Sequence, residues 1–160
     1  MTDDLQQETI DYVAICRVGA AYADYVTRRV WPKLDELFAP DATITVDTVT
    51  GAPIELTGAK GVGDFIAGAV ARFEFFELVI LNTTVELRVD GDADSARGRL
   101  FTCELRQDLA NGHWSNAFGV YHDEYRRTDD RWRFARRRYQ SLARTGRAEI
   151  FPFPQHGGFD

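Results

Sequence analysis

The clearest alternation of hydrophobic and polar residues lies between residues 114 and 142. Two runs in this stretch, one through Tyr121 and Tyr125 and one through Trp132 and Phe134, follow the two-residue period of a β-strand. Polar residues 128–131 separate the runs and are typical of a tight turn. The pattern predicts an antiparallel hairpin in the middle of a sheet, and the covered face of that sheet needs helices packed against it.

The first half of the chain supplies those helices. Apolar residues at helical spacing predict a first helix over residues 8–26. Pro32 suits a first helical turn and begins a short second helix with apolar positions in 34–38. A third helix is expected over residues 64–73, with Asp64 as its N-cap.

Four further strands are predicted from alternation and from turn residues at their ends. They cover residues 42–49, 54–56, 77–89 and 97–107, with turns at 50–53, 90–92 and 111–112. Helices followed by consecutive strands define an α+β fold, in which a cone-shaped, curved antiparallel sheet wraps round three helices and encloses a deep pocket. The 160 residues form one domain, with a core over about 10–142 and a C-terminal tail over 143–160.

Charge and composition narrow the functional classes. A net charge of −6 argues against nucleic-acid binding, and the arginine cluster at 136–138 is interpreted as a strand whose alternate arginines pair with the surplus carboxylates of the helices. No apolar run approaches the roughly 18 residues that span a bilayer, and the acidic N-terminus lacks the features of a signal peptide, so a cytoplasmic protein is expected. Cys16 and Cys103 have no metal-binding spacing and are expected to be free thiols.

Candidate chemistry rests on ionisable side chains, because the sequence has no phosphate-binding loop, metal-ligand cluster or nucleophile motif. No cofactor is therefore expected. The residues expected to converge inside the cone are Tyr22, Asp24, Asp47, Asn82, Glu104, Tyr121, His122 and Asp123. A carboxyl group in an apolar pocket has a raised pKa and can exchange protons near neutral pH, which favours general acid–base catalysis.

Several of these residues have a structural alternative. Glu104 could face the pocket or the solvent, since both faces of its strand carry mixed residue types. Tyr22 could be a core residue, and Asp47 could cap the turn that follows its strand. His122 points away from the pocket if Tyr121 points into it, while a buried Asn82 would need hydrogen-bond partners.

Three segments together resemble a known family. They read AAYADYVTRRVWPKLDELFAPDATITVD, VELRVDGDADSARGRLFTCE and GVYHDEYRRTDDRWRF, and their order and spacing are similar to those of a SnoaL-like domain of the nuclear transport factor 2-like superfamily. The resemblance runs from about Ile10 to Leu142. It implies a cone-shaped fold with a deep pocket and a homodimer or homotrimer, in a superfamily that includes scytalone dehydratase, bile-acid dehydratase and ketosteroid isomerase.

The resemblance also implies roles for particular residues. Tyr22 stands at a substrate-facing tyrosine, Glu104 at a catalytic aspartate of the bile-acid dehydratase, and Tyr121 near the oxyanion-binding position of the isomerase. The chain departs from the family where an aspartate is replaced by Thr27 and a histidine by Asn82 or Thr83, and the isomerase base position falls on Val46, one residue before Asp47.

The sequence therefore predicts a cofactor-independent lyase of the dehydratase type, or an isomerase, acting on a small apolar cyclic molecule such as a steroid, polyketide or aromatic ring. The predicted catalytic residues are Glu104, Tyr22, Tyr121 and Asp47, and the predicted substrate-binding residues are Asn82, Asp24, Trp31, Phe101 and Phe118. Two alternatives stay open: a binding protein that has lost the chemistry, and a structural subunit like the β subunits of ring-hydroxylating dioxygenases. The expected partners are a small apolar ligand and further copies of the chain, with no nucleic acid, membrane or metal.

Overall fold

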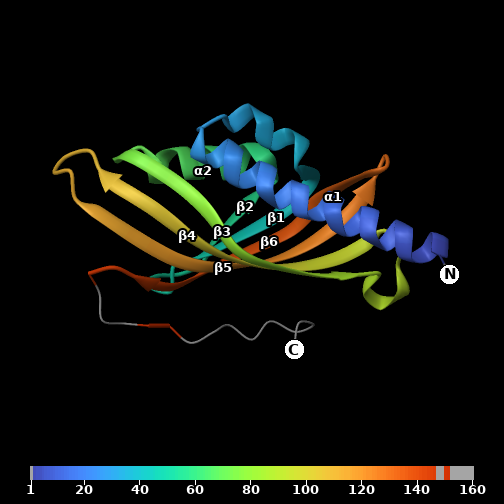
Figure 1. Ribbon diagram of the computed structural model, residues 1–160. Helices are drawn as coiled ribbons and strands as arrows, with labels where there is room; N and C mark the ends of the chain where they lie inside the picture. Colours follow the sequence, from blue (N-terminus) through green and yellow to red (C-terminus); the bar gives the residue numbers. More distant parts are fainter. Residues whose placement is uncertain (1, 147–149, 152–160) are drawn as a thin grey trace.

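The computed structural model describes residues 2–146 together with 150 and 151. One strongly curved sheet forms a single layer, and the helices lie against its concave side (Figure 1). The helices are α1 (Thr2–Thr27), the 3₁₀ helix η1 (Trp31–Glu36), α2 (Gly58–Val70) and the short 3₁₀ turn η2 (Val89–Gly91). The strands are β1 (Phe38–Asp47), β2 (Ile54–Thr57), β3 (Phe73–Leu87), β4 (Ser95–Asp108), β5 (Trp114–Thr128) and β6 (Arg131–Arg144). The predicted α+β class and curved sheet are confirmed.

The strand order is β2-β1-β6-β5-β4-β3, and the sheet is mixed. Strands β3 to β6 form consecutive antiparallel pairs, as predicted, whereas β1 and β6 run parallel, with Ile44 opposite Arg137. The prediction of a wholly antiparallel sheet is therefore wrong at this pair. Local turn signals specify hairpins between neighbouring segments, but they carry no information on a pairing between strands about ninety residues apart in the chain.

The β5–β6 hairpin turns at Asp129 and Asp130, which both have positive φ angles, 51° and 56°. The alternation in β5 places Tyr121, Asp123 and Tyr125 on the buried face. In β6 a register shift opposite Glu124 and Tyr125 inserts one extra residue, so that Phe134 and Arg137 are both buried. This bulge changes the phase of β6 and turns one arginine of the 136–138 cluster into the core.

Helix α1 packs its apolar stripe on the sheet, with Ile15, Tyr22 and Val26 almost completely buried. It begins at Thr2, earlier than the sequence predicts, because its first turns are polar and carry no periodic apolar signal. Helix α2 begins at Gly58 rather than at Asp64, since burial of Val62 holds a glycine-rich first turn that has low helix propensity. Asp64 lies inside α2 and pairs with Lys60, so it is not the N-cap.

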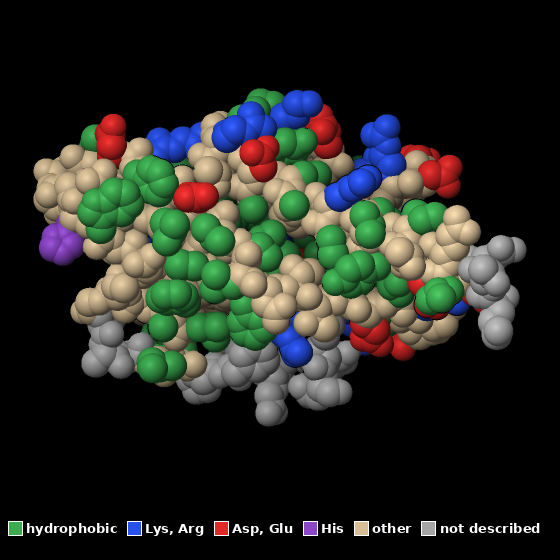
Figure 2. Space-filling view, viewed as in Figure 1, with side chains coloured by type: hydrophobic (Ala, Val, Ile, Leu, Met, Phe, Trp, Pro, Cys, Tyr) green, Lys and Arg blue, Asp and Glu red, His purple; other side chains and the backbone are tan. Residues whose placement is uncertain are grey.

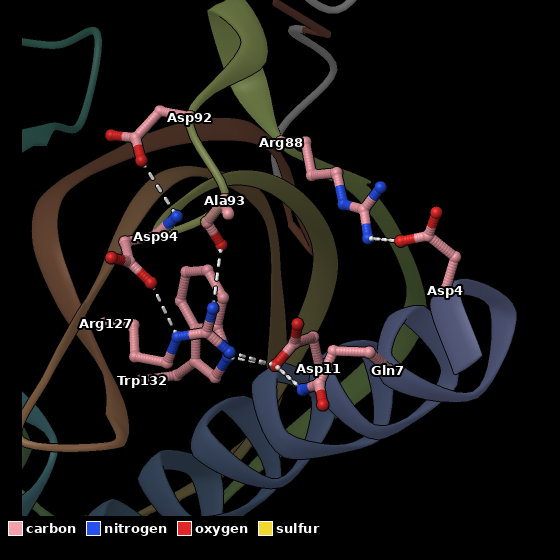
Figure 3. A network of polar contacts seen from close by, with 9 residues as sticks. All are labelled: Asp4, Gln7, Asp11, Arg88, Asp92, Ala93, Asp94, Arg127 and Trp132. Atoms are coloured by element: carbon pink, nitrogen blue, oxygen red, sulfur yellow. Dashed lines mark hydrogen bonds and ion pairs between the residues drawn. The ribbon is translucent and has the colours of Figure 1, made fainter.

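A polar network fixes the N-terminal half of α1 to the far end of the sheet (Figure 3). Asp11 is buried and its Oδ1 accepts hydrogen bonds from Arg127 Nη1 at 2.7 Å, from Trp132 Nε1 at 3.0 Å and from Gln7 Nε2 at 3.2 Å. The guanidinium of Arg127 also stacks over the Trp132 ring and pairs with Asp94 at 2.8 Å. One carboxylate thus joins the first helix to the last two strands.

The surface is mixed in character. On the side seen in Figure 1, hydrophobic side chains gather across the middle and Lys and Arg side chains follow the upper rim (Figure 2). The large exposed hydrophobic residues include Leu81 and Trp114, each 59% exposed. None of the helices in the described ranges is long and apolar enough to cross a membrane. Cys16 and Cys103 are both free thiols.

The predicted C-terminal tail is described only in part. Beyond β6, Ile150 bridges to Ala143, and the Phe151 N–H donates to the carbonyl of Leu142 at 2.9 Å. Residues 147–149 and 152–160 lie outside the described residues.

Candidate active site

A cavity of about 250 Å³ lies between the concave face of the sheet and α1 and α2. Most of its wall is apolar and comes from α2, β1 and β3, while most of the polar groups come from α1, β4, β5, β6 and the turn before β3. The lining residues are Tyr22, Val26, Ile44, Val46, Thr48, Val62, Phe65, Ile66, Ala69, Val70, Arg72, Phe73, Phe76, Leu78, Glu104, Arg106, Ala117, Tyr121, Tyr139 and Arg144. The predicted pocket is therefore present in the fold.

Glu104 is the carboxylate of this cavity. Even-numbered residues of β4 face inward, as the burial of Leu100 and Thr102 shows, so Glu104 points into the cavity and its side chain is only 24% exposed. Desolvation by the surrounding apolar wall raises the pKa of Glu104, although the nearby charges of Arg106 and Arg144 oppose the rise. The Arg106 contact is loose, with 3.4 Å between Nη1 and Oε2. A carboxyl group in this state binds a proton more readily than a solvated glutamate, which favours a role in proton transfer.

Three tyrosines line the cavity together with Glu104. Tyr22 from α1 and Tyr121 from β5 are buried, with ring centroids 6.0 Å apart, and Tyr139 from β6 lies 5.1 Å from Tyr121. Burial raises the pKa of all three, that of Tyr139 to about 12. The hydroxyl groups therefore stay protonated at neutral pH, and each can donate a hydrogen bond to an oxygen in the cavity.

A buried ion pair lies beneath Tyr22 and Tyr121. Arg137 Nε is 2.9 Å from Asp123 Oδ1, and both side chains are almost completely inaccessible to solvent. The guanidinium carbon of Arg137 lies 4.0 Å from the centroid of the Tyr22 ring and 3.8 Å from that of Tyr121. Burial raises the pKa of Asp123 to about 6, with Arg137 opposing the rise. The pair holds a positive charge against the rings of two candidate catalytic tyrosines.

Gly119 makes room for Tyr139. A Cβ atom added at Gly119 would overlap Cε2 of the Tyr139 ring, so only a glycine lets that ring cross the β5 backbone into the cavity. Sequence reasoning missed Tyr139, Arg106 and Arg144, although Gly119 within an alternating strand was a signal of such a close approach. It also missed Arg137, because the bulge that turns this residue inward leaves no mark in the alternation.

The structure brings together three of the four predicted catalytic residues, Glu104, Tyr22 and Tyr121, in one cavity. It does not bring Asp47 to them. Asp47 is not part of the cavity wall; its Oδ1 accepts the Val49 N–H at 2.8 Å, and it lies 3.8 Å from Arg138. Asp47 therefore has the turn-capping position that the sequence offered as its alternative.

The five predicted substrate-binding residues all lie outside the cavity wall. Asp24 is exposed on α1 and pairs with Arg28, and Asn82 is exposed on β3 beyond a register shift in that strand. Phe101 and Phe118 belong to the opposite face of the sheet from Glu104 and Tyr121, because side chains alternate along β4 and β5. Trp31 packs against the core. Periodicity alone did not show which face of β4 and β5 points into the cavity. The structure shows that Phe101 and Phe118 are on the face turned away from it.

One position where the family pattern is broken, Thr27, has a structural role here. Thr27 Oγ1 accepts the backbone N–H of Leu78 at 3.0 Å, which fixes the end of α1 to β3. Strand β3 presents Phe76 and Leu78 to the cavity, and no histidine is among the described lining residues. Within the described part of the chain no cluster of His, Cys, Asp or Glu side chains could hold a metal ion.

Comparisons with known proteins agree with this architecture. The SnoaL-like domain family matches residues 7–138, so the chain belongs to this family. The uncharacterized protein Rv2910c of Mycobacterium tuberculosis (strain ATCC 25618 / H37Rv) is 28% identical over 135 residues, which cover 81% of this chain and 84% of the relative.

Two solved structures share the fold at low sequence identity. The hexachlorocyclohexane dehydrochlorinase LinA-type3 from Novosphingobium barchaimii LL02 superimposes with a TM-score of 0.76 at 22% identity, over 94% of this chain and 99% of the other. A scytalone dehydratase-like protein from Novosphingobium aromaticivorans DSM 12444 gives a TM-score of 0.73 at 20% identity, over 93% of this chain and 100% of the other.

Proposed function

We propose that the protein is a cofactor-independent lyase of the dehydratase type, or an isomerase, that acts by general acid–base chemistry on a small, mainly apolar cyclic substrate. One observation carries the proposal: Glu104, a carboxyl group with a raised pKa, lies in an apolar cavity with the protonated hydroxyl groups of Tyr22 and Tyr121. A general base and hydrogen-bond donors to oxygen are the two kinds of group that proton abstraction next to a carbonyl requires.

In this mechanism Glu104 removes a proton from the carbon next to a carbonyl group or a leaving group. The electrons of the broken C–H bond form a carbon–carbon double bond, and the negative charge that develops on the substrate oxygen is stabilised by hydrogen bonds from Tyr22 and Tyr121. In a dehydration the hydroxyl group then leaves as water, with the proton that Glu104 carries. Acid–base assistance of this kind contributes on the order of 10² to 10⁴ in rate.

The similar proteins support the same class of reaction. A dehydrochlorinase removes HCl and a dehydratase removes water, so both reactions named for the solved structures are eliminations. The cavity here has a carboxylate where elimination needs a base, although it lacks a histidine among its described lining residues.

Incubation with a panel of β-hydroxy ketones, hydroxysteroids and polyketide-like phenols, followed by mass spectrometry, tests the proposal. We expect the wild type to remove water or shift a double bond in at least one compound, and Glu104→Gln to lose at least about 10²-fold in kcat. Glu124→Gln is the matched control, because Glu124 lies on the other face of the neighbouring strand and is 51% exposed. Full turnover by Glu104→Gln would refute the assigned base.

A second candidate function, ligand binding without catalysis, is favoured by one observation. Thr27 stands where related dehydratases have an aspartate, and in this fold it is a structural hydrogen-bond acceptor for Leu78. Ligand that binds to both the wild type and Glu104→Gln and is recovered unchanged from both would favour this function over the enzymatic one.

A further inference from the structure

The cavity wall carries more positive than negative charge. Its charged side chains, within the part of the chain that the structure describes, are Glu104, Arg72, Arg106 and Arg144. A cavity for a purely apolar ligand has no need of three arginines, because burying each guanidinium without a full set of acceptors is unfavourable. The arginines therefore need an explanation beyond the shape of the pocket.

Arg72 already has a partner of its own. Its Nη2 lies 2.7 Å from Asp108 Oδ2, its side chain is 70% exposed, and it stacks on the edge of the cavity over the Phe73 ring. This ion pair joins the start of β3 to the end of β4, so Arg72 has a structural role at the mouth of the cavity. Two arginines and one carboxylate remain inside.

Arg106 and Arg144 are incompletely paired. Arg106 contacts Glu104 through one nitrogen at 3.4 Å, and Arg144 Nη2 donates to the neutral hydroxyl of Ser141 at 3.3 Å. The Nε atoms of both arginines are buried and have no hydrogen-bond acceptor among the described residues. Each guanidinium has five N–H donors that match the geometry of a carboxylate. The two side chains thus offer donors and a net positive charge on the same side of the cavity as Glu104.

We propose that the substrate carries a carboxylate group, which binds Arg106 and Arg144 while its ring lies against the apolar wall of α2, including Phe65, Ile66 and Val70. The proposal rests on the proposed function and goes beyond it, since it adds a carboxylate group to the mainly apolar cyclic substrate. With such a ligand bound, two arginines face two carboxylates and the charges of the inner cavity balance. The same contact would fix the ring relative to Glu104, which lies two residues before Arg106 on the same face of β4.

Direct binding measurements with a matched pair of probes test this inference. 2-Naphthoate and 2-naphthamide have nearly the same shape and differ in charge, and isothermal titration calorimetry gives Kd for each. We expect the wild type to bind the carboxylate at least about tenfold more tightly than the amide. Arg106→Gln and Arg144→Gln should each remove most of this preference, while Arg136→Gln, which changes an arginine that is 65% exposed, should leave it intact.

Glu104→Gln should change the affinity for 2-naphthoate in the opposite direction from the two arginine variants. Removing the negative charge that competes for Arg106 should tighten 2-naphthoate binding by about tenfold and leave 2-naphthamide unchanged. This gain cannot come from a folding defect, so it keeps the test decisive if an arginine variant fails to fold. Equal binding of the two probes, no naphthoate binding at millimolar concentration, or a preference that survives both arginine changes would each overturn the inference.

The outcomes separate this inference from the proposed function, because calorimetry measures binding and mass spectrometry measures conversion. A preference for the carboxylate without turnover of any panel compound would leave the inference standing and count against the enzyme. Turnover of neutral ketones with equal affinity for both probes would support the enzyme and overturn the inference. The arginines would then interact only with negative charge that develops on the substrate during the reaction.

Discussion

The carboxyl group of Glu104 is held in a place that suits its proposed role as a base and lowers the stability of the folded protein. Its charged form has lost much of its hydration to the apolar wall, and Arg106 replaces only part of it through a contact of 3.4 Å. The same desolvation that makes the group a usable base therefore makes the folded protein less stable whenever the group is ionised.

Glu104→Gln should raise stability in a pH-dependent way. The pKa of Glu104 is higher in the folded than in the unfolded state. The contribution of Glu104 to the stability of the folded state is therefore fully present below the unfolded pKa and is lost as pH rises through the folded pKa. At about pH 7 the variant should therefore unfold at a higher urea concentration than the wild type, and this difference should shrink as the pH falls toward the ordinary glutamate pKa of 4.5. An unchanged or lower midpoint at neutral pH would show that Glu104 is not desolvated.

At the residue scale, sequence reasoning found the candidate site where a side chain follows the simple period of its element. Glu104, Tyr22 and Tyr121 keep the phase of β4, α1 and β5. The alternation in β4 left both faces open for Glu104, however, and it was the family resemblance that implied a site role for all three residues. Arg137 and Tyr139 belong to the part of β6 that follows the bulge, where the alternation shifts by one residue. The position of a bulge depends on pairing with the neighbouring strand, which the residue pattern of one strand does not contain.

At the scale of elements, β5 and β6 pack closely where the Tyr139 ring of β6 lies against Gly119 of β5. We expect Gly119→Ala to destabilise the protein by about 1–3 kcal/mol, because the added methyl group overlaps the Tyr139 ring and forces it out of its packed position. The free energy of unfolding from urea titration measures the loss. Gly51→Ala is the control, since an added Cβ there has no neighbour within 4 Å. Equal stabilities of the two variants would mean that the Tyr139 ring can move away at no cost.

The elements themselves were predictable to different degrees. The β5–β6 hairpin and the strands before it followed from alternation and turn residues, and helix α1 followed from its apolar stripe. The start of α2 and the parallel contact of β1 with β6 did not, because burial and long-range pairing override local propensity at both places. The order of the predicted elements also indicated a curved, cone-shaped sheet, and the family resemblance implied the same shape.

At the scale of the whole molecule, Asp11 connects the two ends of the chain. Asp11→Ala would leave Arg127 and the buried Trp132 indole N–H without their shared acceptor, and we expect a loss of about 2–4 kcal/mol in the free energy of unfolding. Asp4→Ala, which removes an exposed ion pair with Arg88 from the same helix, should cost less than about 0.5 kcal/mol. Urea unfolding followed by tryptophan fluorescence compares them, and similar losses would contradict a special role for Asp11.

The parallel contact between β1 and β6 also determines when the cavity can form during synthesis of the chain. Ile44 and Val46 of the cavity wall are synthesised early, but Tyr139 and Arg144 come from the last strand, which lies directly beside β1. During translation β1 must therefore wait for almost the entire remaining chain before its central neighbour is available, and contacts so distant in sequence form slowly. The nascent protein therefore has no complete cavity until β6 has left the ribosome, because Tyr139 and Arg144 form part of the wall.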